Sequence, residues 1–299
     1  MTEHDQLRHT LFLDSETGKR SARDALRWGT RKMTVGIVAI CNTGLPGGQS
    51  DERIVICTDW RISTQLGSSD TLYKLASVTP HFRCVFAGDP SEAKAVISRL
   101  QRIFRAAEVV DETNILTLVR SALYEQRAEK RNALAQTRYG MDHDDVLKVG
   151  KERLPSENFA RYLDAAAAVR LDTEFIVAGF GDSDNYIVET DFACKVGFSG
   201  DFACIGDGEH LARASLIARR LQDITLLNNA LYYIYEAKKA AERVNSVGRS
   251  TLLTVLTNDG GDRAVLAGRY DVFDGMYRKY GPRNVPSDLE IEENVFEGS

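Results

Sequence analysis

Two apolar runs joined by a turn-rich connection make up the stretch VGIVAICNTGLPGGQSDERIVICT, residues 35–58. The runs, residues 35–41 and 53–58, are short and rich in β-branched side chains, as buried strands are. Glycine, proline and asparagine in the connection favour a turn over a helix. The stretch therefore predicts a hairpin, the connection that builds antiparallel sheets.

A second hairpin and then a helix are predicted after the first hairpin. Residues 71–78 and 82–87 are apolar runs on either side of a Thr-Pro-His turn. Shortly after them comes Asp89, a good N-cap, followed by Pro90, which suits the first helical position. Glu92, three residues after the cap, completes the signal for a helix start. The apolar face of this helix comprises Val96, Leu100, Ile103, Phe104 and Ala107.

A helical excursion is predicted over about residues 112–172. One helix covers residues 113–138, with Leu116, Val119, Leu123 and Ala128 facing inward. A second helix starts near Ser156, a candidate cap. The polar residues 139–155 between these helices leave the compact core.

Strands return in the second half of the chain. Four short apolar runs, EFIVAGF, NYIVETD, ACKVGF and FACIG, lie between residues 174 and 206. A helix then follows GDG, with Leu211, Ala214, Ala218 and Leu221 on one face, and another covers residues 226–244, with Ala230, Tyr233, Ala237 and Ala241 inward. Two final strands, residues 251–257 and 264–268, flank the turn NDGG.

The predicted elements come in blocks: strands, helices, strands, helices, strands. Two antiparallel sheets must each bury one face on the other sheet and one face on helices. We therefore expect an α+β fold, a four-layer α-β-β-α sandwich, over residues 34–280. Residues 1–33 are an N-terminal extension or propeptide, and the acidic residues 281–299 are expected to form a loosely ordered tail.

Composition narrows the class of protein. The chain of 299 residues has a formal net charge of −5, which argues against binding to a nucleic-acid backbone. No apolar run approaches the ~20 residues of a membrane span, and the N-terminus lacks a signal-peptide core. The five cysteines lie in apolar, strand-like runs, where we expect small buried hydrophobes in a reducing compartment. Cytoplasmic location, no membrane partner, no metal and no cofactor follow as expectations.

Thr34 stands directly before the first strand. An N-terminal threonine is both nucleophile and base, because its hydroxyl attacks while its own α-amine takes the proton. The pKa of such an amine is about 8, so part of it is neutral at physiological pH. An amide nitrogen inside a chain cannot act in this way. Thr34 is therefore a candidate nucleophile only if the Met33–Thr34 bond is opened.

Several segments together resemble one known family. The segments TVGIVAI, IVICTDWRIS and TLYKLASVTPHFRCVFAGD look like the first half of a proteasome β-type or HslV-type peptidase, an N-terminal-nucleophile hydrolase. The segment FACIGDGEHLARASLIARR is similar to the strand-to-helix turn of that family. The resemblance is distant and covers roughly residues 34–108 and 173–268.

The resemblance implies a role for each matching residue. Thr34 matches the nucleophile, Asp59 the aspartate of the family's hairpin strand and Lys74 the lysine that stabilises charge beside the hydroxyl. Gly88 matches the glycine whose backbone N–H faces the oxyanion, and Ser246 lies in the segment that carries the supporting serine. Four of these residues also have a purely structural interpretation: Thr34 as a β-branched residue that favours a strand, Lys74 and Asp59 as an internal ion pair, and Gly88 as a close-packing turn.

Two positions depart from the family pattern. Asp207 stands where the family usually has a serine near the amine, and Arg243 stands where it often has an aspartate. An aspartate beside the amine would raise the pKa of that amine and make it a poorer base. An inactive homologue is therefore a second interpretation of the same residues.

Three alternatives remain for the Met33–Thr34 bond. Residues 1–33 could be a self-cleaved propeptide, translation could begin at Met33, or the extension could be retained over an inactive site. The first two predict a threonine peptidase that acts on peptides or unfolded proteins, assembles as a homo-oligomeric ring or related assembly and works with an ATPase partner. The third predicts a non-catalytic scaffold or assembly subunit. Besides the peptidase and the scaffold, a third candidate function is an N-terminal-nucleophile amidohydrolase that acts on a small amide.

Overall fold

Hairpins build both sheets of the protein. The computed structural model describes residues 34–44, 51–59, 62–64, 67–69, 74–282, 286 and 289–296, with 62–64 and 67–69 described by their backbone alone. The first sheet has the strand order β10 (Phe202–Ile205), β1 (Gly36–Asn42), β2 (Glu52–Asp59), β11 (Thr251–Leu256) and β12 (Asp262–Ala264). Every neighbouring pair in it is antiparallel.

The second sheet is also antiparallel throughout. Its strands, in order, are β5 (Leu75–Ser77), β6 (Phe82–Gly88), β7 (Thr173–Phe180), β8 (Asn185–Thr190) and β9 (Val196–Phe198). A separate two-stranded ribbon pairs β3 (Ile62–Thr64) with β4 (Gly67–Ser69). The prediction of an α+β protein with two antiparallel sheets is confirmed.

A hydrophobic cluster fills the space between the two sheets. It joins Val38 and Ile56 of the first sheet to Val85, Ile176 and Ile187 of the second. Successive side chains of a strand point to opposite faces, so the neighbouring residues of these strands face the helices instead. Each sheet is therefore apolar on both faces, as the continuous apolar runs of the sequence predict.

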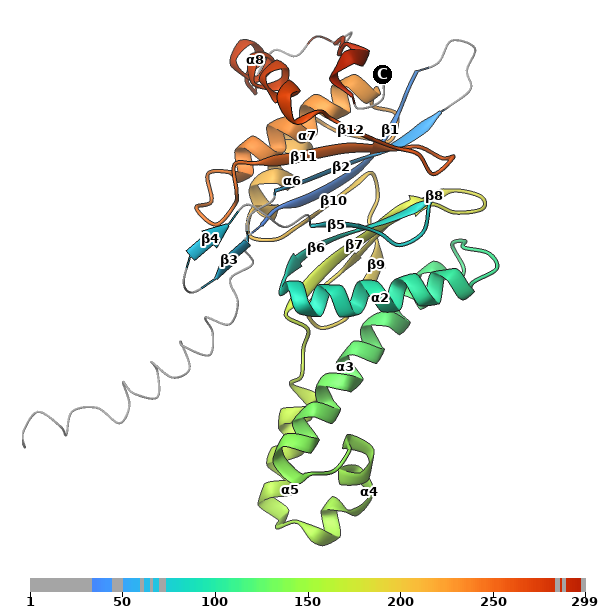
Figure 1. The fold of residues 1–299 in the computed structure, drawn as a ribbon, viewed down its shortest axis with the longest axis vertical. Coiled ribbons are helices and arrows are strands. Elements are labelled where there is room, and N and C mark those ends of the chain that lie inside the picture. The colour runs from blue at the N-terminus through green and yellow to red at the C-terminus, as the bar shows by residue number, and fades with distance from the viewer. Residues whose placement is uncertain are drawn as a thin grey trace, which may run out of the picture. The chain divides into compact units, whose positions relative to one another are not determined.

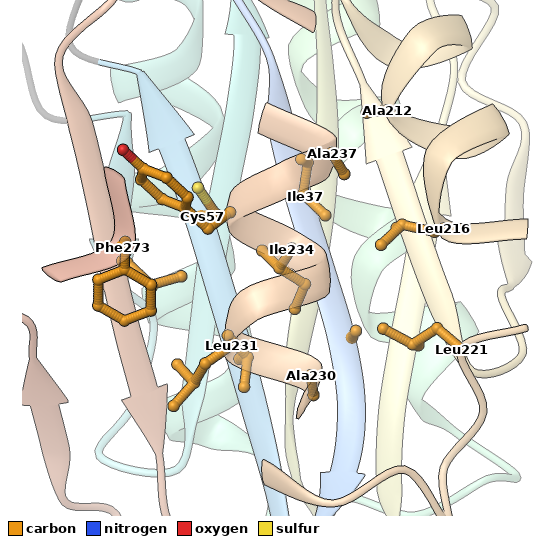
Figure 2. Close-up of a cluster of buried hydrophobic side chains, with 14 of the residues drawn as sticks. Ile37, Cys57, Ala212, Leu216, Leu221, Ala230, Leu231, Ile234, Ala237 and Phe273 are labelled. Atoms are coloured by element: carbon orange, nitrogen blue, oxygen red, sulfur yellow. The ribbon is translucent and has the colours of Figure 1, made fainter. Parts of the chain in front are cut away.

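Helices cover the outer face of the first sheet (Figure 1). Helix α6 (Glu209–Ala218) packs on β10 and β1, α7 (Leu227–Ala241) packs on β1 and β2, and α8 (Tyr270–Tyr280) packs on α7. Figure 2 shows Ala230, Ile234 and Ala237 of α7 lying over Ile37 and Cys57 of the strands. Of the face predicted for α7, Ala230, Ala237 and Ala241 are buried and Tyr233 is partly buried.

Helices also cover the outer face of the second sheet. Helix α2 (Pro90–Ala106) begins at the predicted cap, where the carboxylate of Asp89 accepts a hydrogen bond of 2.8 Å from the backbone N–H of Glu92. Helix α3 (Ile115–Tyr139) packs beside α2 and buries Val119 and Leu123 as predicted. Ala128, predicted to face inward, is exposed, because it lies on the opposite side of α3 from the buried Gln126, two residues earlier.

The predicted polar excursion contains a helix of its own. Helix α4 (His143–Arg153) and helix α5 (Ser156–Ala167) pack on the second half of α3 (Figure 1) around Tyr162. The hydroxyl of Tyr162 lies 2.5 Å from Nδ1 of His143. Ser156 does not cap α5: Pro155 occupies the cap position and Ser156 is the first helical residue.

The inward face of α6 differs from the predicted one. Leu211, Ala214 and Ala218 are exposed, whereas Ala212 and Leu216 are fully buried against the first sheet. Leu221, the fourth residue of the predicted face, is buried, but it lies beyond the end of the helix. The helix is apolar on two sides, and its packing angle selects the side that carries Leu216.

The C-terminal part of the chain is more ordered than predicted. Strand β12 ends at Ala264, and a 3₁₀ turn (η1, Ala267–Arg269) and then α8 replace the end of the predicted strand. Residues 289–296, which include a second 3₁₀ turn (η2, Glu293–Val295), return to the first sheet. Phe296 forms a β-bridge with Val265 and is buried. The expected loosely ordered tail is wrong for these residues.

The prediction that the cysteines are buried is confirmed, since all five are buried and free. Within the described ranges, no helix has the length and apolar character to cross a bilayer, and no group of three or more His, Cys, Asp and Glu side chains could hold a metal ion.

Candidate active site

The candidate site lies where β1 begins and β2 ends. The two strands are antiparallel with Gly36 opposite Thr58, so Thr34 and Asp59 come together at one end of the sheet. The hydroxyl of Thr34 donates a hydrogen bond to Oδ1 of Asp59. Both side chains are almost completely buried, with 1% of Thr34 and 0% of Asp59 exposed.

Lys74 reaches the same carboxylate from the other sheet. It directly precedes β5, and its carbonyl accepts a hydrogen bond of 3.1 Å from the N–H of Phe86 in β6. Its Nζ lies 3.0 Å from Oδ1 of Asp59, and both side chains are buried. A charge pair that has lost its water interacts more strongly than an exposed one, provided its other hydrogen bonds are satisfied. Thr34, Asp59 and Lys74, the three side chains predicted to act together, therefore form one cluster.

Backbone N–H groups complete the surroundings of Asp59. The N–H of Gly248 donates to Oδ2 over 2.7 Å, and the N–H of Val35 donates to Oδ1 over 3.3 Å. Both carboxylate oxygens thus have donors, and the orientation of the carboxylate is fixed. Ser246, the other predicted residue of this segment, is partly buried two residues before Gly248. Among the described residues, no hydrogen bond joins Ser246 to Thr34, Asp59 or Lys74.

A buried lysine that the sequence analysis did not identify lies behind Gly248. The carbonyl of Gly248 accepts a hydrogen bond of 2.7 Å from Nζ of Lys238 in α7, and the ammonium of Lys238 also pairs with Glu242. Burial lowers the pKa of Lys238, and the nearby Glu242 opposes that shift. The available signal was the spacing of Lys238 and Glu242, four residues apart on one helix face.

The turn after β10 holds the backbone of Thr34 from the opposite side. The N–H of Gly208 donates to the carbonyl of Thr34 over 3.3 Å. Gly206 has φ +92°, and a Cβ there would lie 2.4 Å from the same carbonyl oxygen, so only glycine fits. Asp207, between them, is partly exposed, and its side chain forms no hydrogen bond with the described residues.

Gly88 has a local reason to be glycine. It ends β6 with φ +132°, and a Cβ there would lie 2.1 Å from the carbonyl oxygen of Asp172. Glu92 of α2 accepts the backbone N–H of Asp172 over 2.5 Å, and Lys130 of α3 pairs with both acidic side chains. No hydrogen bond joins Gly88 to Thr34 among the described residues, so the oxyanion role of Gly88 stays a prediction.

Cys57 lies near this cluster but is a poor nucleophile. It is fully buried in β2, and burial raises the pKa of its thiol to about 12, against the smaller opposing effect of Lys238. The thiolate is the reactive form of cysteine, so Cys57 is inert at neutral pH. Of the nucleophilic side chains around Asp59, Thr34 is the one whose hydroxyl is oriented by the carboxylate.

No protein-family model and no curated protein matches this sequence at a significant level. The candidate site therefore rests on the geometry of its own residues. That geometry offers a threonine hydroxyl, a carboxylate that orients it, and an ammonium group that compensates the carboxylate and lies close to any negative charge formed on the hydroxyl.

Proposed function

We propose that the chain has the N-terminal-nucleophile hydrolase fold and acts as a proteasome-like threonine peptidase, with Thr34 as its nucleophile. The observation that carries the proposal is the carboxylate of Asp59, which accepts hydrogen bonds from both the hydroxyl of Thr34 and the ammonium of Lys74. The substrates are peptides or unfolded proteins, and the working form is a homo-oligomer.

The mechanism requires Thr34 to be the first residue. Its free amine takes the proton from its hydroxyl, and the Oγ1 attacks the carbonyl carbon of the substrate peptide bond. The positive charge of Lys74 stabilises the developing negative charge, and the N–H of Gly88 donates to the oxyanion. The protonated amine then gives its proton to the leaving amine, and an ester links Thr34 to the acyl fragment. Attack by water, assisted by the same amine, releases the acid and restores Thr34.

A second candidate function is a proteasome-fold subunit without activity. Two observations favour it: Thr34 is 1% exposed in the full chain, and the two supporting positions are occupied by Asp207 and Arg243, of which Arg243 is exposed. As long as Met33 is bound to Thr34, the nitrogen of Thr34 is an amide and cannot act as a base. The intact chain is thus catalytically silent under either proposal.

Intact mass and N-terminal sequencing of the purified protein distinguish the two functions. The peptidase proposal expects a chain that begins at Thr34 and hydrolyses fluorogenic peptides, with that hydrolysis lost in a Thr34→Ala protein. A chain that retains residues 1–33 in its native assembly would instead support the scaffold.

A further inference from the structure

Lys238 is a charged residue in a place where a helix normally carries an apolar one. It lies on α7 between buried neighbours, and 0% of its side chain is exposed. Moving an ammonium group out of water is costly unless it is paired and hydrogen-bonded. A buried ion pair seldom stabilises a protein more than apolar residues of the same volume would. Stability alone is therefore a weak explanation for this lysine.

The contacts of Lys238 give a more specific explanation for its position. Its ammonium pairs with Glu242 one turn later and donates to the carbonyl of Gly248 over 2.7 Å. Gly248 is also a donor: its N–H donates a hydrogen bond to Oδ2 of Asp59 over 2.7 Å. Gly248 is thus held at both its N–H and its carbonyl, between a charged group in the helix layer and the carboxylate of the candidate site.

The titratable groups that face Lys238 come from two segments. Glu242 is the C-cap residue of its own helix, whereas Cys57 and Asp59 belong to β2. Of these groups, Asp59 is connected through Gly248, and Cys57 is a neutral thiol. A hydrogen-bonded chain through a low-dielectric interior orients each member more firmly than an isolated bond does.

We propose that Lys238 is a positioning residue for the candidate site: with Glu242 it fixes the turn at Gly248, and this turn holds the carboxylate of Asp59 against Thr34 and Lys74. Its catalytic consequence rests on the proposed peptidase function, but its structural consequence at Gly248 does not. Among the described residues, no hydrogen bond joins Lys238 to Thr34, so it acts through Gly248 on the orientation of Asp59.

A Lys238→Met protein tests the proposal, because methionine has similar length but neither charge nor donor. The measurement is amide hydrogen exchange of Gly248 in the full chain. We expect exchange about tenfold faster or more than in the wild type, the factor for losing one hydrogen bond to a charged group. In a Lys238→Arg protein, which keeps the charge and the donors, slow exchange should largely return.

The chain offers a matched control in α7 itself. Glu236 pairs with Arg219, the C-cap residue directly after α6, and Arg219 donates to the carbonyl of Gly281 over 3.0 Å, so this buried pair also holds a glycine carbonyl. It has no hydrogen bond to Asp59 or Gly248. A Glu236→Gln protein should therefore leave the exchange of Gly248 unchanged, even where its overall stability falls.

The outcomes separate the inference from the proposed function. If Gly248 exchanges at the wild-type rate in Lys238→Met, or equally fast in Glu236→Gln, the inference is wrong whatever the activity. If exchange rises only in Lys238→Met, the inference holds even when no peptide is hydrolysed, and only the peptidase proposal fails. Where peptides are hydrolysed, kcat should fall about tenfold in Lys238→Met with little change in KM, and recover in Lys238→Arg.

Discussion

Asp59 has four hydrogen-bond donors from three parts of the chain: the hydroxyl of Thr34 and the N–H of Val35 just before β1, the ammonium of Lys74 before β5, and the N–H of Gly248 before β11. A buried carboxylate of this kind is stable only while its donors and its countercharge are present. At the residue scale, the site is therefore sensitive to the loss of a single charge.

Replacing Lys74 by methionine should destabilise the protein by about 3–5 kcal/mol, since it leaves Asp59 buried without a countercharge. Urea unfolding followed by circular dichroism measures the change. The matched control is Arg161→Met, because Arg161 forms an ion pair with Glu157 on the surface of α5, where such pairs contribute about 0–1 kcal/mol. Similar losses in both proteins would contradict the account of Asp59.

Gly88→Ala should cost about 1–3 kcal/mol or more, because alanine at φ +132° is strained and its Cβ would meet the carbonyl of Asp172. Gly140 is the comparison, since it also has positive φ, +65°, but a Cβ there would meet nothing within 4 Å. Thermal unfolding of both alanine variants measures how much stability each one loses. The Gly88 variant should lose clearly more stability, and an equal loss would show that the contact with Asp172 is unimportant.

At the scale of secondary-structure elements, α6 shows how an apolar helix chooses its buried side. Leu216 is fully buried in the cluster under α6 and α7, whereas Leu211 on the same helix is 37% exposed. Figure 2 shows Ala212 and Leu216 directed toward the strands of the first sheet. The two leucines are the same residue type in the same helix, so a difference between the effects of replacing them reports the contribution of burial.

Leu216→Ala should therefore destabilise the protein by about 2–5 kcal/mol, the cost of a cavity in a packed core. Leu211→Ala should change the free energy of unfolding by no more than about 0.5 kcal/mol. Chemical denaturation of the two proteins measures both values. The reverse order would mean that the face predicted from the sequence is the buried one.

The sequence predicted the elements better than their faces. Asp89 and Pro90 mark the start of α2 because capping is local, and residues 35–58 predict the hairpin because its turn residues are local too. The face of α6 was wrong because residues on both of its sides are apolar. Helix α8 was missed, although Tyr270, Phe273 and Tyr277 have helical spacing.

Part of the candidate site could also be predicted from the sequence. Thr34 and Asp59 stand at strand ends that the first hairpin brings together, so the order of the elements already places this pair side by side. Lys74 comes from the other sheet, and only the family resemblance assigned it to the same site. The spacing of Lys238 and Glu242 indicates their ion pair, but the contact of Lys238 with the backbone carbonyl of Gly248 cannot be predicted from residue types. Tertiary packing alone places that lysine behind Asp59.

At the scale of the whole molecule, the last described residues complete the core of the first sheet. Val295 and Phe296 are buried in the cluster that also contains Val35, just before β1, and Ile37 of β1, so residues from both ends of the described chain share one core. Arg263 of β12 pairs with Glu293 and lies over the ring of Phe296. Because the segment is acidic overall, the sequence analysis did not predict that its apolar residues pack in the core.

Phe296→Ala should cost about 3–5 kcal/mol, as for other buried phenylalanines. Glu290→Ala, at an exposed position of the same segment, should be nearly neutral. Unfolding in urea compares the two proteins with the wild type. Wild-type stability in Phe296→Ala would contradict the placement of residues 289–296 in the core.

The central claim is that Thr34 becomes a nucleophile when its amine is free. The most direct measurement uses a removable N-terminal fusion whose cleavage leaves Thr34 as the first residue, with fluorogenic peptides assayed before and after removal. The account predicts that hydrolysis begins on removal of the fusion and stays absent in the matching Thr34→Ala protein. No hydrolysis after removal, or equal hydrolysis by the Thr34→Ala protein, would contradict it.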